Sequence, residues 1–424
     1  MVGPTLDSPA AVDPQAVVRF NTLFLAVSMA IAWAIIQLQA SLVAITTEAL
    51  TGSTTLAGIG PAVFLAASGL ATLPAGRLMD RFGRVPGISL GFLVATVGGG
   101  LLFAAVSQSD LRLFFIGLAG LGAGLGAVGL ARAGAADMYP AERRASGIGR
   151  VLVGAAVGAL LAPIAFGPLL RERVADPASL AAPWLVAATV TALGAGIVWA
   201  IRVDPLTVAR WIHAEAAGPV GRVVTVPVAQ RSLRQIFAQR GPRAALLAAV
   251  SAQVVMTSAM SLVSLEMRHH GHDLAGISVA LAAHFVGMFG LSPVMGRFVD
   301  RVGRRRALVI GLVVLAFAVL AMALSTELIV LMPVMFAVGL GWNVAYVAAT
   351  ALIADGTDPG ERARALGGAD LIALLGSAAG AAVASAILGT LGLLVVVVAA
   401  AALVVLPAAI LTRPFRAPPL GSSA

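Results

Sequence analysis

Apolar runs of about 20 residues recur along the whole chain, separated by short polar stretches. About 20 consecutive apolar residues are what an α-helix needs to span a bilayer core. In lipid every backbone polar group must be bonded within the protein, which favours helices, and the runs lack the short alternation of membrane β-barrels. The pattern predicts an all-α membrane protein of twelve transmembrane helices, near residues 20–47, 56–76, 87–107, 111–137, 147–170, 181–202, 243–267, 274–296, 307–324, 328–355, 367–389 and 391–412.

The predicted helices fall into two sets of six. Between them, residues 203–242 hold short amphipathic pieces broken by Pro227 and by two Gly-Pro pairs, as in a tether. We therefore expect five parts: a cytoplasmic tail at 1–19, a six-helix bundle at 20–202, a cytoplasmic linker at 203–242, a second bundle at 243–412 and a cytoplasmic tail at 413–424.

Composition agrees with a lipid environment, since 59% of the residues are hydrophobic and 11% are charged, against about 25% charged in a soluble domain. The net charge of +9 does not indicate nucleic-acid binding, because the arginines occupy short loops between spans rather than one basic face. The chain contains no cysteine, which excludes disulfides, thiol redox chemistry and thiolate metal sites.

The distribution of arginine predicts the orientation in the membrane. With the N-terminus in the cytoplasm, 22 of the 28 arginines are cytoplasmic and four are external, while Arg132 and Arg150 lie in or at the edges of spans. Loops rich in arginine stay on the cytoplasmic side. We therefore expect a multi-pass protein of the plasma (inner) membrane with both termini inside.

The two sets of helices share an internal repeat. Residues 76–84 (GRLMDRFGR) recur as residues 296–304 (GRFVDRVGR) at an offset of 220, and the pairs 56–59/274–277 and 142–143/361–362 recur at 218 and 219. Because each set holds an even number of spans, the copies have the same orientation. Parallel six-helix halves with a substrate site between them are one design of secondary transporters.

The nine-residue motif combines groups with distinct physical roles. Its first glycine allows close approach of another helix, and its aspartate can accept hydrogen bonds from the exposed amides at a helix N-terminus. The second glycine permits a tight turn, and the arginines can bond acids. The simpler interpretation is that the loop charges only anchor the topology.

With this doubled loop motif, the chain resembles the major facilitator superfamily over about residues 20–412. The resemblance implies that the motif helps lock the two bundles in an outward-open state, with Asp80 meeting the start of the eleventh helix near Gly367 and Gly368 and Arg84 pairing with Asp137. By symmetry, Asp300 would meet the fifth helix near Gly147, within reach of Arg150. The expected conformational latch comprises Gly76, Asp80, Arg81, Gly83, Arg84, Asp137, Gly296, Asp300, Arg301, Gly303, Arg304 and Asp355.

Two helices depart from the family's drug-exporter patterns. The fifth contains Gly154, Gly158 and Ala162-Pro163, which resembles a degenerate glycine–proline exporter motif but also suits simple packing of small residues. In the fourth, the run at 120–124 (GLGAG) is present, but Ile116 occupies the place of the exporters' arginine. A proton-coupling role for that arginine therefore does not carry over.

Ionisable groups inside spans are costly and suggest function. We expect the proton carrier to be Glu48, Glu266 or His284; the alternatives are glutamates in interfacial water and a buried histidine bonded to a neighbouring helix. The resemblance places helices 1, 4, 7 and 10 around the substrate cavity. Its candidate lining residues are Gln37, Gln39, Arg132, Gln253, Trp342, Asn343 and Tyr346.

The favoured function is secondary active transport, with proton-coupled efflux of an amphipathic small molecule by alternating access. Proton-coupled uptake of a nutrient and a non-transporting receptor or scaffold on the same fold are the alternatives. We expect no enzyme activity, cofactor or nucleic-acid partner, and a monomer in the lipid bilayer. The external His269, His270, His272 and Asp273 could bind zinc or nickel, but a solvated loop is the favoured interpretation and no metal site is assigned.

Overall fold

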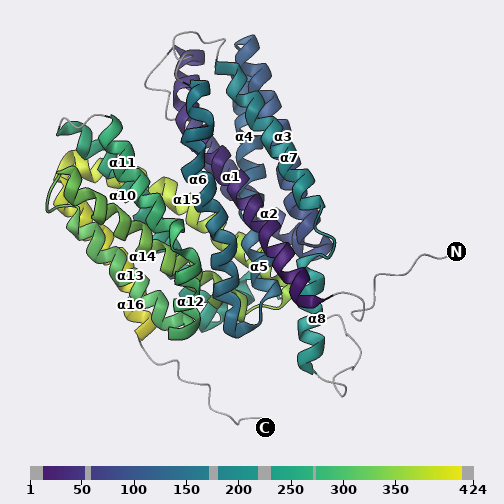
Figure 1. Ribbon diagram of the computed structural model, residues 1–424. Helices are drawn as coiled ribbons and strands as arrows, with labels where there is room; N and C mark the ends of the chain where they lie inside the picture. The colour runs from purple at the N-terminus through teal and green to yellow at the C-terminus, as the bar shows by residue number, and fades with distance from the viewer. Residues whose placement is uncertain (1–12, 53–58, 171–179, 218–230, 271–273, 413–424) are drawn as a thin grey trace.

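The computed structural model describes residues 13–52, 59–170, 180–217, 231–270 and 274–412, and within these ranges it contains helices and no strands (Figure 1). The first group of helices comprises α1 (Pro14–Thr51), α2 (Ile59–Phe82), α3 (Arg84–Gln108), α4 (Leu111–Val128), α5 (Ala131–Met138), α6 (Arg144–Leu170) and α7 (Ala181–Trp199). The second comprises α10 (Arg240–His269), α11 (Leu274–Phe285), the π-helical η6 (Val286–Gly290), α12 (Ser292–Val302), α13 (Arg304–Ala321), α14 (Leu328–Asp355), α15 (Pro359–Leu391) and α16 (Leu393–Thr412).

These helices make a twelve-span arrangement. Within the described residues, ten helices are long and apolar enough to cross a membrane, and α11, η6 and α12 form an eleventh span bent by 47°. The twelfth is α13, whose 18 residues begin with three arginines and so leave a shorter apolar stretch. The fourth span is divided into α4 and α5 by a short turn.

The helices pack as two bundles that meet through a few elements. In the first bundle α1 packs on α6 and α3 on α4 and α7; in the second α14 packs on α10, α11 and α13. Contact between the bundles runs mainly through α2 with α15 and α6 with α12. Short helices α8 (Pro205–Ala217) and α9 (Leu233–Ala238) lie in the segment between the bundles.

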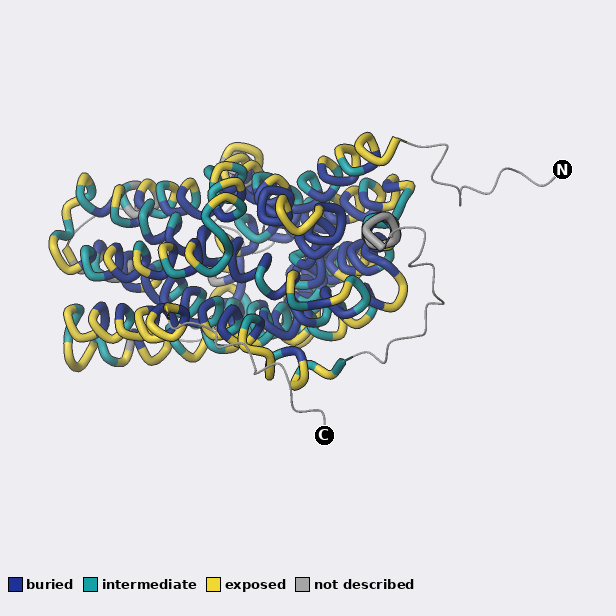
Figure 2. Tube along the Cα trace, turned by 90° about the horizontal axis from the view of Figure 1, so that it is seen from below, coloured by how far each residue is buried: buried dark blue, intermediate teal, exposed yellow. Residues whose placement is uncertain are grey.

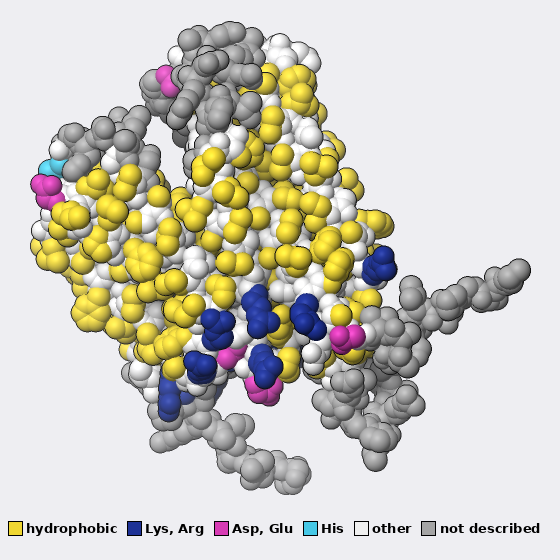
Figure 3. Space-filling view, viewed as in Figure 1, with side chains coloured by type: hydrophobic (Ala, Val, Ile, Leu, Met, Phe, Trp, Pro, Cys, Tyr) yellow, Lys and Arg dark blue, Asp and Glu magenta, His cyan; other side chains and the backbone are white. Residues whose placement is uncertain are grey.

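The bundles touch at one end and separate at the other. They approach near the end where the chain termini emerge (Figure 1), and a notch divides them at the opposite end of the space-filling view (Figure 3). Arginine side chains gather at the closed end of the same face. The cleft between the bundles therefore opens at the end away from the termini.

The outer faces of the bundles are apolar. Buried residues gather where helices face one another, and exposed residues follow the outer edges (Figure 2). Large side chains such as Ile164, Phe317 and Ile329 are each at least 70% exposed on these surfaces. A surface of this kind is stable in contact with lipid rather than water.

Glycines allow α1 and α6 to approach backbone to backbone. A Cβ on Gly154 would lie 1.8 Å from the Ala26 carbonyl oxygen, and one on Gly158 would lie 2.0 Å from that of Ala30. These distances are far below van der Waals contact, so only glycine fits at either position. The geometry agrees with the packing interpretation of the glycines in the fifth span.

We expect Gly154→Ala to lower the thermal unfolding temperature of the purified protein by several degrees. The added methyl group would force α1 and α6 apart, and overpacking of this kind costs about 1–3 kcal/mol. The matched control is Gly100→Ala on α3, where a Cβ would meet nothing within 4 Å. Equal unfolding temperatures for the two variants would contradict the packing argument.

Candidate functional site

At the closed end, Asp80 of α2 caps a helix of the other bundle. Its carboxylate accepts the backbone N–H groups of Ala363 (3.0 Å) and Arg364 (2.9 Å) on α15. A Cβ on Gly76 would lie 2.5 Å from the Ala363 carbonyl oxygen, so the glycine lets the two helices meet closely. The carboxylate thus bonds two backbone amides in the second turn of α15, near the positive end of the helix dipole.

This contact lies about one turn earlier than the expected position near Gly367 and Gly368. The reason is that α15 begins at Pro359, where Asp358 and Glu361 form a capping box with proline at the first helical position. Gly367 instead accepts a 2.8 Å hydrogen bond from the Thr72 hydroxyl one turn above.

The buried side chain of Arg84 bonds several groups at the same contact. It donates to Asp80 (2.8 Å), to Asp137 on α5 (2.6 Å) and to the Pro359 carbonyl oxygen (2.6 Å). Arg362 of α15 also bonds Asp137, which is thus shared by cations from both bundles. We call Asp80, Arg84, Asp137 and Arg362 the first junction.

A second junction repeats this arrangement between α12 and α6. Asp300 accepts the N–H groups of Ala145 (3.2 Å) and Ser146 (2.8 Å), while Arg304 bonds Asp300, Asp355 and the Ala141 carbonyl oxygen. Arg144 completes it by crossing to Asp355. The second junction is therefore Asp300, Arg304, Asp355 and Arg144.

The two junctions are related residue by residue. Arg144 and Arg362 each donate to the carbonyl oxygen eight positions earlier in their own half, and each crosses to the aspartate of the other half. Their offset of 218 differs by one residue from the repeat expected at 142–143 and 361–362, so the structural partner of Arg362 is Arg144 rather than Arg143. Neither crossing arginine is among the latch residues predicted from the sequence.

Burial distinguishes the two junctions. Arg84 and Asp137 are 1% and 0% exposed, whereas Arg304 and Asp355 are 11% and 30% exposed. Since ion pairs gain more when water is excluded and are screened when it is not, each charge of the first junction depends more strongly on its partner.

The other motif residues have different roles. Gly83 and Gly303 precede α3 and α13 with φ of +107° and +92°, a conformation that favours glycine. Arg81 and Arg301 are exposed, and the Arg81 guanidinium lies 5.1 Å from the Phe82 ring centroid. Arg150, expected near Asp300, instead donates to the Tyr139 hydroxyl (3.2 Å).

The segment between the bundles is fastened to both of them. Asp204 accepts the N–H of Val85 (2.8 Å) at the start of α3. At the other end of the segment, Arg231 bonds the Glu361 carboxylate and donates to the Gly356 carbonyl oxygen (3.1 Å). These contacts were not foreseen, because nothing in the composition of a polar linker marks which charges will dock.

Deeper between the bundles, Arg132 of α5 bonds Asp370 of α15, with Nη2 2.6 Å from Oδ1 and 2.7 Å from Oδ2. Asp137, on the same helix as Arg132, is occupied by the arginines of the first junction. The Arg132 guanidinium also lies 4.9 Å from the ring centroid of Tyr346 on α14. Asp370 lies about three turns after the start of α15. The pair is therefore deeper in the molecule than the junctions at the closed end.

An aromatic row continues from Tyr346 across to the first bundle. Tyr346 stacks on Trp342 (4.5 Å between centroids), Trp342 meets Phe289 edge-on (5.7 Å), and Phe289 meets Trp33 of α1 (4.5 Å). The π-helical turn η6 carries Phe289 at the bend of its span, as π-helical turns often do at functional sites. Gln253 of α10 fixes the row by accepting the Trp342 indole N–H (2.9 Å).

The remaining cavity candidates divide by burial. Gln37 is half-buried, whereas Gln39 is 7% exposed. Asn343 is fully buried inside the second bundle, where it donates to Ser292 Oγ (3.0 Å). Trp342, Tyr346 and Arg132 are among the predicted cavity residues, whereas Trp33, Phe289 and Asp370, which they contact, are not.

The structure does not bring the three proton-carrier candidates together in its described part. Glu48 is exposed and Glu266 is half-buried, with His270 Nδ1 3.7 Å from its carboxylate. His284 is fully buried and its Nδ1 lies 3.1 Å from the Met335 carbonyl oxygen. Of the external histidine loop, to which no metal site was assigned, His272 and Asp273 lie outside the described residues, among which no metal-ligand cluster occurs.

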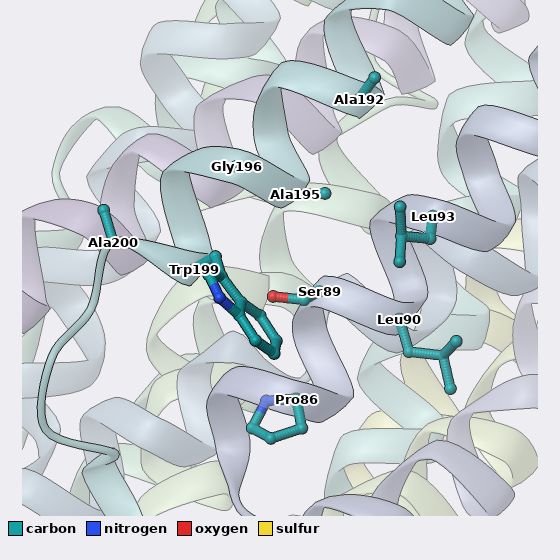
Figure 4. A pocket seen from close by; sticks show the side chains of 9 residues that line it. All are labelled: Pro86, Ser89, Leu90, Leu93, Ala192, Ala195, Gly196, Trp199 and Ala200. Carbon is teal, nitrogen blue, oxygen red and sulfur yellow. The ribbon is translucent and has the colours of Figure 1, made fainter.

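Two hollows lie away from the aromatic row. One of about 710 Å³ is an apolar groove on the outer face between α3 and α7, lined by Leu90, Leu93 and Trp199 among others, where the Ser89 hydroxyl points toward Trp199 (Figure 4). The other, of about 550 Å³, lies beside the second junction and is lined by Arg144, Arg231 and Asp355 among others. The groove opens on the outer surface of the first bundle and not into the cleft between the bundles.

Comparison with known proteins gives relatives over most of the chain. It is 33% identical to the MFS-type transporter YdeG of Bacillus subtilis, covering 81% of this chain and 80% of that protein. It is 26% identical to the riboflavin transporter RfnT of Brucella anthropi, covering 84% and 85%.

Solved structures share the fold at low sequence identity. The human organic anion transporter MFSD10 aligns with a TM-score of 0.73 at 17% identity, covering 93% of this chain and 99% of that one. A bacterial homologue of the iron transporter ferroportin, in its outward-facing state, aligns with a TM-score of 0.65 at 15% identity, covering 92% and 98%. The Major Facilitator Superfamily profile matches residues 22–265 and 244–423. This chain belongs to the Major Facilitator Superfamily of transporters.

Proposed function

We propose that this protein exports an amphipathic small molecule across the plasma membrane by alternating access, driven by proton entry. The observation that carries the proposal is the pair of junctions. Both include contacts between the bundles that water could replace, and both lie at one end of the molecule. Breaking them would open that end, and the existing cleft would close as the bundles rock.

The junctions would then act as conformational latches, and the structure would correspond to an outward-facing state with the junctions in the cytoplasm. A static receptor or scaffold has no need of two matched, breakable contacts. Uptake remains the second candidate for direction. Riboflavin is a candidate substrate, because RfnT is named as a riboflavin transporter and the aromatic row offers stacking surface for a planar ring system.

The orientation is tested with single cysteines in this cysteine-free chain. We expect an impermeant maleimide to label Gln108→Cys from outside intact cells, because this exposed residue lies at the open end of α3. Arg234→Cys in α9 should be labelled only after permeabilisation. The opposite pattern would place the junctions outside and reject the proposed topology.

The latch role is tested by neutralising the capping carboxylates. Asp80→Asn removes charge-assisted bonds worth about 1.5–3 kcal/mol, which should shift the ratio of outward to inward states about tenfold or more and slow transport. Asp300→Asn should have a smaller effect, because its junction is more exposed to water.

Glu327→Gln is the matched control, because this exposed side chain precedes α14 without capping it. Flux should be measured in proteoliposomes, together with cysteine accessibility in the cleft. Wild-type flux in Asp80→Asn, Asp300→Asn and the double variant would rule out the latch role.

Direction and coupling are tested in right-side-out and inverted vesicles with an imposed pH gradient. We expect inverted vesicles with an acidic lumen to accumulate a fluorescent amphipathic dye, and Glu48→Gln, Glu266→Gln or His284→Gln to abolish this accumulation without stopping downhill exchange. A neutralised carrier can no longer load and release a proton.

Accumulation of the dye or of riboflavin in right-side-out vesicles alone would establish uptake instead. If all three variants keep wild-type pH dependence, the carrier is another acid, such as Asp137, Asp355 or Asp370, or the transport is not proton-coupled.

A further inference from the structure

The Arg132 guanidinium uses only part of its hydrogen-bonding capacity. Nη1 donates to the Gly129 carbonyl oxygen (2.9 Å) and Nη2 donates to Asp370, but Nε has no acceptor among the described residues although the side chain is 97% buried. Nε and Nη2 lie on one edge of the guanidinium and together match the two oxygens of a carboxylate. Asp370 occupies only half of this edge.

Asp370 is the member of the pair that can leave. Its carboxylate is 19% exposed against 3% for Arg132, and both of its bonds to Arg132 come from the same nitrogen. Arg132 is held independently by the Gly129 carbonyl oxygen and the Tyr346 ring. An incoming anion therefore meets a fixed cation and a replaceable counter-ion, whereas an incoming cation would have to expel a buried guanidinium.

Aromatic surface borders the same position. Tyr346, which the guanidinium faces, is half-buried, and so is Trp33 at the other end of the aromatic row. Trp342 and Phe289 between them are at most 4% exposed and keep the row rigid. A planar ring held by its carboxylate on Arg132 could pack against the exposed part of Tyr346, the ring of the row that lies at the guanidinium.

We propose that the transported substrate is a planar aromatic carboxylate that binds Arg132 through Nε and Nη2 in place of Asp370. This inference rests on the proposed function. Arg132 belongs to the first bundle and Asp370 to the second. Substrate binding would thus break an ion pair between the bundles in the same event that fills the site. Without substrate the Arg132–Asp370 ion pair holds the two bundles together, and with substrate bound this ion pair is broken.

The test is calorimetric titration of the full-length protein in lipid nanodiscs with three probes of similar shape: 2-naphthoate, its neutral amide and the cation 2-naphthylmethylammonium. Wild type should bind naphthoate in preference to the other two. Asp370→Asn should tighten naphthoate binding by about tenfold or more, because the competing anion is gone, and leave the amide unchanged. Arg132→Gln should lose naphthoate binding.

Because Arg132→Gln leaves Asp370 unpaired and could unfold the protein, the double variant Arg132→Gln/Asp370→Asn provides a second neutral site that should also fail to bind naphthoate. Equal binding of the three probes, preference for the cation, no binding by wild type, or weaker naphthoate binding by Asp370→Asn would each overturn the inference. Vesicle transport of a neutral or cationic dye would in those cases leave the proposed function standing, so the two failures are distinguishable.

Discussion

The closed end of the molecule depends on one constraint: a buried carboxylate must find donors. Asp80 and Asp137 are almost completely buried, and their donors come from both bundles. Desolvation of an ion costs several kcal/mol unless its partners are well placed, so the bundles can close only in the register that supplies every donor. The same cost makes the contact reversible, because water entering a parting interface replaces the lost hydrogen bonds. A buried junction of this kind therefore specifies a closed geometry strongly while contributing modestly to net stability.

The first and second junctions meet this constraint in the same way, which makes the closed end symmetric. They differ in how deeply their charges are buried. Asp80 bonds the second turn of α15 and Asp300 the first turn of α6, and each crossing arginine joins its own half to the aspartate of the other. The Arg132–Asp370 pair adds a third tie farther inside. All three ties lie toward the same end and hold the bundles together there, and the notch in Figure 3 lies at the opposite end.

Sequence patterning was sufficient for the fold and for the residue types at the junctions, but not for the atoms they contact. Apolar runs of membrane length identify the helices, and the repeated motif identifies Asp80 and Asp300 as caps. The capping target was placed one turn late because hydropathy marks where a span enters lipid, whereas α15 begins at a polar capping box before that point. The crossing arginines were missed because the repeat was aligned on Glu-Arg identity, one residue away from the structural register.

The interior polar residues show a second limit of sequence reasoning. Periodicity assigns His284 and Asn343 to helices. Which way their side chains face depends on the rotation of each helix about its axis, and packing against the bent span that contains η6 sets that rotation here. That rotation turns Asn343 into the second bundle toward Ser292 and presents Phe289 to Trp33. A pairing such as Arg132 with Asp370 depends on two rotations and on the approach of two bundles, so no spacing within the chain encodes it.

A transporter that moves an anion through a region of low dielectric must keep its binding cation paired at every stage. An arginine without an acceptor would carry the full desolvation cost, and it cannot release its proton to avoid that cost. A carboxylate on the opposite bundle provides the needed acceptor when the site is empty, and a ligand carboxylate provides it when the site is filled. The exchange replaces one anionic partner of the arginine by another, so the guanidinium is paired before and after it. Before the exchange the ion pair of the arginine joins the two bundles. After the exchange it joins one bundle to the ligand.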